Sequence, residues 1–314
     1  MSDEKSKKEK SIFGSIKNPS AVEPKKLTLD SKIKFRCHPG VSCFTACCGG
    51  IKIVLTPYDI LCLSRRLELE PSEFVQRYTE PTWLEKTDMP GVLLKMREDD
   101  DRCPFVTPEG CTVYTDRPTA CRYYPVGMAD FHEGGSRDAE GNENISAEDK
   151  FYFIVREPHC KGFEEEKEWT VREWRADQGV DVRDEMNKGW LRLVMRRKSF
   201  GHQASLSEQA KRMFFMASTD LHTFRRFIFE SSFLDTYELD PQLIEDIKTD
   251  DVALMLFSFE YLAATLFGAK QMPIRPDKLK EKVEQLKKRQ GEQILQSVAD
   301  YEKMKGDRDK KDED

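Results

Sequence analysis

Cysteine is the residue type in this chain with the clearest capacity for chemistry, since nine cysteines occur among 314 residues. Eight of them lie in stretches rich in glycine or proline, where loops dominate. These eight candidate metal ligands are Cys37, Cys43, Cys47, Cys48, Cys103, Cys111, Cys121 and Cys160. Thiolates are soft ligands that favour zinc, copper(I) and iron–sulfur clusters. The cysteines therefore predict a site for an iron–sulfur cluster or iron, with zinc as the alternative.

Disulfides are a weaker interpretation of the same cysteines. Residues 1–10 carry charges and lack the apolar stretch of a secretory signal. In a reducing compartment, thiols stay unpaired unless a metal, a cofactor or a redox cycle uses them. We therefore expect a cytoplasmic protein. Cys62 is excluded from the ligand set, because it falls inside a predicted helix between two leucines and is expected to be a small buried hydrophobic residue.

The spacing of the cysteines matches neither the paired CxxC knuckles of a zinc ribbon nor the cysteine run of bacterial ferredoxins. Cys47 and Cys48 are adjacent, and in an extended backbone adjacent side chains point to opposite sides. Their thiols would then reach different centres. The sequence is compatible with one polynuclear site or with two sites.

Other polar residues near the cysteines have both a functional and a structural interpretation. His38 and His159 each neighbour a cysteine, but a lone histidine in that position is more often incidental than a ligand. Eight thiolates around two divalent ions would leave net negative charge, so we expect Arg36 and Arg122 beside them. The alternative is an arginine that satisfies loop carbonyl groups. Tyr124 and its neighbouring tyrosines are expected to form a dry packing shell.

The elements that must position the thiols are short in the first half of the chain and helical in the second. The motif Thr56-Pro57-Tyr58-Asp59 and the motif Thr170-Val171-Arg172-Glu173 both predict a helix start. Apolar periodicity predicts helices at about 56–67, from 71, from 170, and at 206–217, 219–230, 241–249 and 251–268. Strands are expected at 51–54, 91–96 and 151–155, with a connection at 82–89.

The predicted fold class is α+β and mostly α, with a loop-rich cysteine-cluster domain containing short strands, followed by a helical region. The expected organisation is a disordered tail at 1–30, the cysteine-cluster metal-binding domain at 31–166, the helical region at 167–270, and a charged helical arm and tail at 271–314. The phenylalanines at 214–229 are expected to form the core of the helical region.

Charge and hydropathy limit the partners. Lysine and arginine total 51 against 57 acidic residues, and this net charge of −6 gives no indication of nucleic acid binding. The apolar stretches are far shorter than the roughly 20 residues that a membrane span needs. Metal ions are therefore the expected partners, and the C-terminal helical arm offers a surface for a protein partner.

The sequence FRCHPGVSCFTACCGG at 35–50, followed by CPFVTPEGCTVYTDRPTACRYYPVG at 103–127, resembles the YkgJ-type cysteine-cluster family. That family is described as a zinc- or iron-chelating domain with a CxxCxxCC-like signature. Here five residues separate Cys37 from Cys43 and three separate Cys43 from Cys47, which departs from the compact signature. Cys160-Lys161-Gly162 resembles a later C-x-G element of the family, which implies Cys160 as a ligand. The resemblance covers about residues 31–165.

Three functional classes follow. The first is a metal-binding module with a structural or electron-transfer role, in a process that the sequence leaves unknown. The second is a metal-dependent protein-modifying enzyme, because the resemblance extends distantly to flagellin lysine N-methylases. The chain has no evident glycine-rich S-adenosylmethionine loop after a strand, so that activity is not transferred to it. The third is a metal storage or delivery protein. No catalytic residues are assigned.

Overall fold

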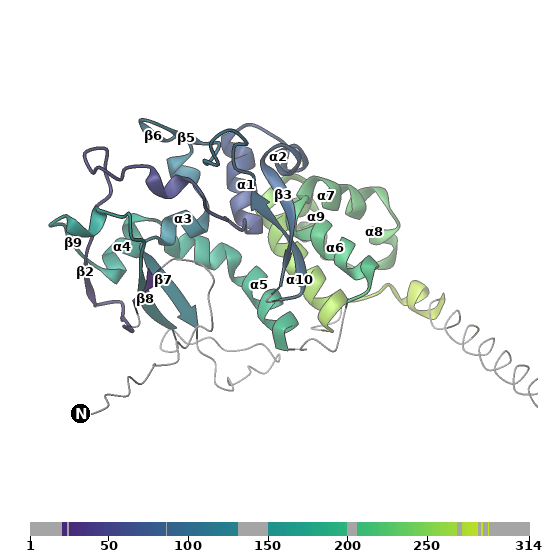
Figure 1. Cartoon of the computed structure of the whole chain (residues 1–314). Coiled ribbons are helices and arrows are strands. Elements are labelled where there is room, and N and C mark those ends of the chain that lie inside the picture. The colour runs from purple at the N-terminus through teal and green to yellow at the C-terminus, as the bar shows by residue number, and fades with distance from the viewer. Residues whose placement is uncertain are drawn as a thin grey trace, which may run out of the picture.

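The computed structural model describes residues 21–130 apart from 24 and 86, then 150–199, 206–268, 272–281, 284 and 288. The described chain is α+β and mostly α, as predicted. In Figure 1 the helices α6 to α10 gather at one end of the molecule, and most of the short strands lie at the other. Most of the predicted tail at 1–30 and most of the predicted arm and tail at 271–314 lie outside the described residues.

Two short helices lie between Cys48 and Cys103 in the sequence. Helix α1 (Pro57–Arg66) begins at the predicted capping box, where the Thr56 side chain accepts from the Asp59 amide and the Asp59 carboxylate accepts from the Thr56 amide. Helix α2 (Pro71–Tyr78) begins at its predicted proline. Proline is favourable there because the first turn of a helix leaves its N–H groups unpaired in any case.

A β-hairpin follows α2, with β3 (Thr79–Leu84) and β4 (Met89–Leu94) paired antiparallel. The prediction of a connection over 82–89 is therefore wrong except at the turn. Strand β3 is mostly exposed and contains a proline, so it lacks the alternation that marks a half-buried strand. The predicted strand at 51–54 is also wrong, because only Val54 makes a bridge, to Leu93 of the hairpin.

The remaining strands form small separate sheets. A three-stranded sheet has the order β1-β8-β7, and two pairs join β2 to β9 and β5 to β6. Their bounds are β1 (Ala21–Val22), β2 (Lys32–Lys34), β5 (Val106–Thr107), β6 (Gly110–Cys111), β7 (Val126–Asp130), β8 (Lys150–Arg156) and β9 (Glu168–Thr170). The predicted strand at 151–155 is confirmed as part of β8.

The predicted helices after Cys160 are confirmed to within about two residues. They are α4 (Val171–Asp177), α6 (Glu208–Thr219), α7 (Leu221–Glu230), α9 (Pro241–Thr249) and α10 (Asp251–Phe267). The same region also contains α5 (Val180–Ser199) and the short α8 (Phe233–Thr236), and no prediction was made for α8. Thr170 and Glu173 form the predicted capping box of α4. Gly179, with a φ of 63°, separates α4 from α5, a backbone conformation that glycine adopts without strain.

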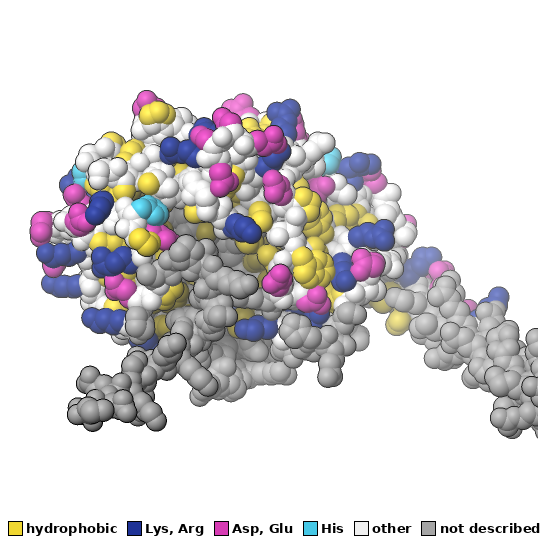
Figure 2. Space-filling model, viewed as in Figure 1, with side chains coloured by type: hydrophobic (Ala, Val, Ile, Leu, Met, Phe, Trp, Pro, Cys, Tyr) yellow, Lys and Arg dark blue, Asp and Glu magenta, His cyan; other side chains and the backbone are white. Residues whose placement is uncertain are grey.

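Three apolar cores support these elements. The largest lies among α5, α6, α7 and α10 and contains Phe214 and Phe224, as predicted. A second packs α1 and α2 against β4 and the loop around Phe105, and a third lies beside β7 and β8. On the surface, side chains of both charge signs are interspersed, as Figure 2 shows. Within the described part of the chain, no helix has the length and apolar character needed to cross a bilayer.

Asp59 joins these parts through a buried polar contact. Its carboxylate is fully buried, and Oδ1 accepts from the Thr119 amide at 2.8 Å and from the Thr119 hydroxyl at 2.7 Å. The Arg183 guanidinium of α5 lies 3.4 Å from the same oxygen and is itself buried. Thr119 begins α3 (Thr119–Tyr123), which carries Cys121. One carboxylate therefore sets the positions of α1, α3 and α5.

We predict that Asp59→Ala lowers the free energy of unfolding by about 3–5 kcal/mol, because it leaves the Arg183 cation buried without its partner. Urea denaturation of the purified chain would measure the loss. The matched control is Asp240→Ala, which removes an exposed N-cap of α9 and should cost about 1 kcal/mol. Equal losses in the two variants would show that Asp59 contributes only as a helix cap.

Candidate metal centre

All nine cysteines fall within the described residues, and none of them forms a disulfide. The eight candidate ligands occupy loops and very short elements. Cys37 and Cys43 lie in the loop after β2, Cys47 and Cys48 in the 3₁₀ turn η1 (Ala46–Cys48), Cys103 before β5, Cys111 in β6, Cys121 in α3 and Cys160 after β8. Cys103 is buried, Cys37 is exposed and the others are half-buried.

The adjacent pair Cys47 and Cys48 lies in a 3₁₀ turn, so the predicted extended backbone at this pair is wrong. Successive side chains of a 3₁₀ turn are still about 120° apart, because the turn contains three residues. The turn begins after Thr45, whose φ is 66°. The Arg102 guanidinium donates to the Thr45 hydroxyl at 2.9 Å and to its carbonyl at 3.1 Å. Arg102 thereby holds the strained start of the turn.

Backbone amides point at several of the sulfur atoms. At Cys103, Cys111 and Cys160 the donor is the amide two residues further along the chain. Burial raises the pKa of these three thiols, and the amide hydrogen bonds oppose that rise. In addition, the Lys161 amide lies 3.1 Å from Cys43 Sγ. These amides come from three separate loops, and each is placed to stabilise a negative sulfur.

The thiols also act on one another electrostatically. Desolvation, followed by the neighbouring thiols Cys47, Cys43 and Cys160, raises the pKa of Cys37 to about 11. Burial, followed by the nearby thiol of Cys103, raises the pKa of Cys121 to about 12. Such thiols hold their protons at neutral pH until a cation displaces them.

Cys47 differs from the rest because a neighbouring thiol donates to it. The hydrogen bond from Cys48 is the largest influence and lowers the pKa of Cys47 to about 7, and the Arg102 charge contributes to the lowering. The same hydrogen bond raises the pKa of Cys48, as does its burial. Within this pair, Cys47 is therefore the more acidic thiol.

Tyr124 has a buried hydroxyl that makes no hydrogen bond among the described residues. The Cys160 thiol is its neighbour: burial raises the pKa of Cys160, and the Tyr124 hydroxyl opposes that rise. Burial, followed by the contact with Cys160, raises the pKa of Tyr124 itself. The hydroxyl is thus placed to donate to a thiolate at position 160.

The predicted cations occupy different settings. Arg36 is exposed, whereas Arg122 is buried and its guanidinium donates to the carbonyl groups of Gln178 at 2.7 Å, Arg117 at 3.1 Å and Thr115. Arg122 therefore satisfies loop carbonyls, which is the structural alternative. The charge of Arg117 lowers the pKa of Cys37 and Cys111, although burial is the dominant influence on both. Arg117 takes the charge-offsetting position expected of Arg122.

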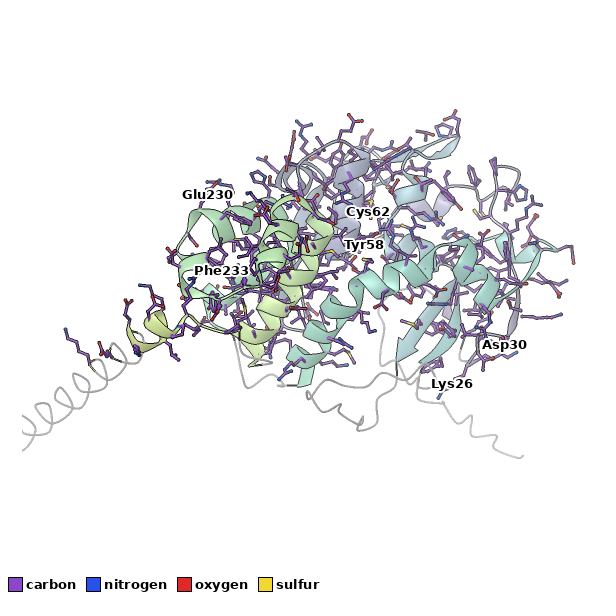
Figure 3. The ribbon with its side chains drawn as sticks, turned by 180° about the vertical axis from the view of Figure 1, so that it is seen from behind. Lys26, Asp30, Tyr58, Cys62, Glu230 and Phe233 are labelled. Carbon is purple, nitrogen blue, oxygen red and sulfur yellow. The ribbon has the colours of Figure 1, made fainter. Side chains whose placement is uncertain are left out.

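The two histidines and Cys62 have other surroundings. His38 Nε2 lies 3.1 Å from the Glu165 carboxylate, and His159 is exposed on the turn before Cys160. Figure 3 shows Cys62 and Tyr58 on the same helix, α1. Burial raises the pKa of Cys62, and the charge of Arg183 and a hydrogen bond with Tyr58 oppose that rise. Cys62 thus has its polar contacts on the side of α1 that faces α5.

The fit to a metal depends on the donor set. Within the described part of the chain, no three candidate ligand side chains are gathered as a ready-made coordination sphere. The thiols lie near enough to shift one another's pKa, and an ion would have to draw their sulfur atoms together. Soft metals bind sulfur ligands. Backbone amides and the Tyr124 hydroxyl lie beside several of these sulfur atoms, where they can orient them. The donor set therefore fits iron or zinc.

Comparison with known families agrees with this chemistry. Residues 36–161 match the CxxCxxCC family, described as "Putative zinc- or iron-chelating domain". We refer to residues 36–161 as the CxxCxxCC domain after this match. It contains all eight candidate ligands, and the predicted family resemblance is confirmed. No curated protein and no solved structure gives a significant match to the chain. The link to flagellin lysine N-methylases therefore stays a prediction.

Two polar contacts of the CxxCxxCC domain were not predicted from the sequence. The tyrosines were expected only to pack, yet the Tyr124 hydroxyl faces Cys160. Arg102 holds the turn that carries Cys47 and lowers the pKa of that thiol. Arg102 is adjacent to Cys103 and Tyr124 lies three residues after Cys121, which was a weak signal for both residues, since neighbours of ligands often orient them. Spacing alone did not distinguish them from other tyrosines and arginines.

We predict that Tyr124→Phe weakens metal binding by the CxxCxxCC domain about 10- to 100-fold, because Cys160 loses its hydroxyl donor. Competition with a chelator would measure the affinity, and the thiolate-to-metal charge-transfer band of the loaded chain should shift. Tyr114→Phe is the control, since the Tyr114 side chain is exposed. Unchanged affinity and an unchanged band in Tyr124→Phe would show that the hydroxyl has no part in the site.

Proposed function

We propose that the CxxCxxCC domain holds an iron–sulfur cluster or iron, with zinc as the alternative, through the eight cysteines outside α1. The observation that carries this proposal is the convergence of backbone amides on thiols from loops that are far apart in sequence. Neutral thiols in an apolar core need no such donors. Thiolates do, because each amide that donates to a charged sulfur reduces the cost of removing that charge from water.

The charge balance of the domain supports the same proposal. Arg117 acts on Cys37 and Cys111, and Arg102 acts on Cys47. Protonated thiols carry no negative charge for these two guanidinium groups to offset. Bound metal would convert these thiols to thiolates and leave excess negative charge, which the guanidinium groups would offset.

The role we propose for the centre is structural or in electron transfer. Four thiolates saturate a tetrahedral ion, whereas a catalytic ion keeps a coordination position open for water or substrate. The eight cysteines themselves lie in loops and very short elements, so bound metal would cross-link segments that few backbone hydrogen bonds join. Zinc would serve only structurally, because it has no redox chemistry, and iron would serve either role.

The setting of the domain is part of the proposal. Free thiols require a reducing compartment, so we place the protein in the cytoplasm. The boundaries at 31–166, 167–270 and 271–314 remain our proposed division of the chain. The charged segment at 271–314 remains the proposed surface for a protein partner, and metal ions are the ligands of the CxxCxxCC domain itself.

Anaerobic purification of the full chain, followed by metal and acid-labile sulfide analysis, tests this function. We expect bound iron with sulfide for a cluster, iron without sulfide for a mononuclear centre, or zinc without sulfide for a chelate. A chain that contains neither metal, with its cysteines in disulfides, would overturn the proposal. The measurement does not depend on any enzymatic activity.

We predict that Cys48→Ser loses at least half of the bound metal and lowers the unfolding midpoint, because metal binding and folding are coupled. Cys62→Ser should keep the full metal content and unfold close to the wild-type midpoint, since Cys62 lies outside the ligand set. Elemental analysis and thermal unfolding of both variants provide the comparison. Metal loss in Cys62→Ser, or full metal content in Cys48→Ser, would contradict the ligand assignment.

A further inference from the structure

Four of the eight candidate ligands contact one apolar core, one contacts another core, and three contact neither. Cys103 belongs to the core beneath α1 and the β3–β4 hairpin, and three further cysteines pack against that core: Cys48, Cys111 and Cys121. Cys160 packs instead against the core beside β7 and β8. The other cysteines, Cys37, Cys43 and Cys47, lie in the surface loop and in the turn η1.

Backbone hydrogen bonds hold the first group together. The Cys103 amide donates to the Cys48 carbonyl at 2.7 Å, which joins the 3₁₀ turn to the loop before β5. The amide of Val106 donates to the Cys103 carbonyl at 3.2 Å, and Val106 is paired with Cys111 across the β5–β6 ladder. Three of these four cysteines therefore sit on one continuous hydrogen-bonded segment, on the side that faces the core.

A separate set of bonds holds the second group. The Lys161 amide reaches Cys43 Sγ at 3.1 Å, and the Arg36 amide donates to the Gly162 carbonyl at 3.0 Å. Both contacts fasten the loop of Cys37 and Cys43 to the C-x-G segment at Cys160. The joint is tight, because a Cβ added at Gly162 would lie 2.7 Å from the Phe35 ring and 2.9 Å from the Arg36 carbonyl.

Cys47 is adjacent to Cys48 in the turn η1, yet only Cys48 of these two packs against the core beneath α1 and the β3–β4 hairpin.

We infer that the CxxCxxCC domain contains two metal centres with four thiolates each, and this inference rests on the proposed function. The outer centre is formed by Cys37, Cys43, Cys47 and Cys160. The inner centre is formed by Cys48, Cys103, Cys111 and Cys121. Four thiolates are the full ligand set of a structural zinc ion or of an iron–sulfur cluster, so each group is complete without the other. The adjacent Cys47 and Cys48 belong to different centres.

The two centres differ in their exposure to solvent. The outer one includes the exposed Cys37, whereas the inner one includes the buried Cys103 and three thiols packed on an apolar core. A chelator reaches an ion through solvent and needs the surrounding ligands to open. The outer metal should therefore leave first, and the inner metal should be retained until the core beneath it opens.

Metal analysis of paired variants of the anaerobically purified full chain tests the division. We expect Cys37→Ser/Cys160→Ser to retain half of the wild-type metal, and Cys103→Ser/Cys121→Ser to lose the other half at least. The control is Cys62→Ser, which should retain all of it. Complete metal loss in the outer pair, with the chain still folded by circular dichroism, would show one polynuclear centre. Full metal content in the outer pair would also overturn the division.

Release of metal to excess chelator provides a second measurement that does not require the inner variants to fold. The wild-type chain should release its metal in two phases of equal amplitude, and the fast phase should be missing from Cys37→Ser/Cys160→Ser. A single phase for the wild type would overturn the two-centre inference while leaving metal binding intact. A wild-type chain without metal would instead contradict the proposed function, so the two failures are distinguishable.

Discussion

The buried carboxylate of Asp59 is the contact on which the placement of the cysteine loops depends. It caps α1, accepts two hydrogen bonds from Thr119 and faces Arg183 on α5. Helix α3 is also tied to the C-terminal end of α4, because Arg122 donates to the Gln178 carbonyl. A buried charge is tolerated only with such partners. Opening the junction would therefore expose Arg183 and release α3, which links the stability of the helical region to the CxxCxxCC domain.

Local signals in the sequence predicted the elements well, and non-local pairing explains the errors. The capping boxes at Thr56 and Thr170 involve groups three residues apart, so the sequence alone identifies both helix starts. Strand β3 was missed because its hydrogen bonds come from β4 and because few of its side chains are buried. The β-branched run at 51–54 lies along the hairpin and makes one bridge. Its strand-like composition therefore predicted more pairing than it has.

The ligand types could be predicted, but their grouping could not. Thiolate chemistry and loop composition identify a metal site from residue types alone. The partition depends on contacts between distant segments, such as the Lys161 amide with Cys43, which are 118 positions apart. No spacing rule specifies such a contact. Cys47 and Cys48 were expected in an extended backbone, whereas they lie in a 3₁₀ turn, where successive side chains are about 120° apart.

Unequal burial gives the two proposed centres different capacities. An ion held by Cys103 and its neighbours would lie against the core of α1 and the hairpin, so its binding energy would contribute directly to folding. An ion or cluster held by Cys37 and its neighbours would lie at the surface, within reach of a partner protein or of solvent. Electron transfer requires proximity to the partner, and metal exchange requires access. Either activity is therefore assigned to the outer centre, and cross-linking of the fold to the inner one.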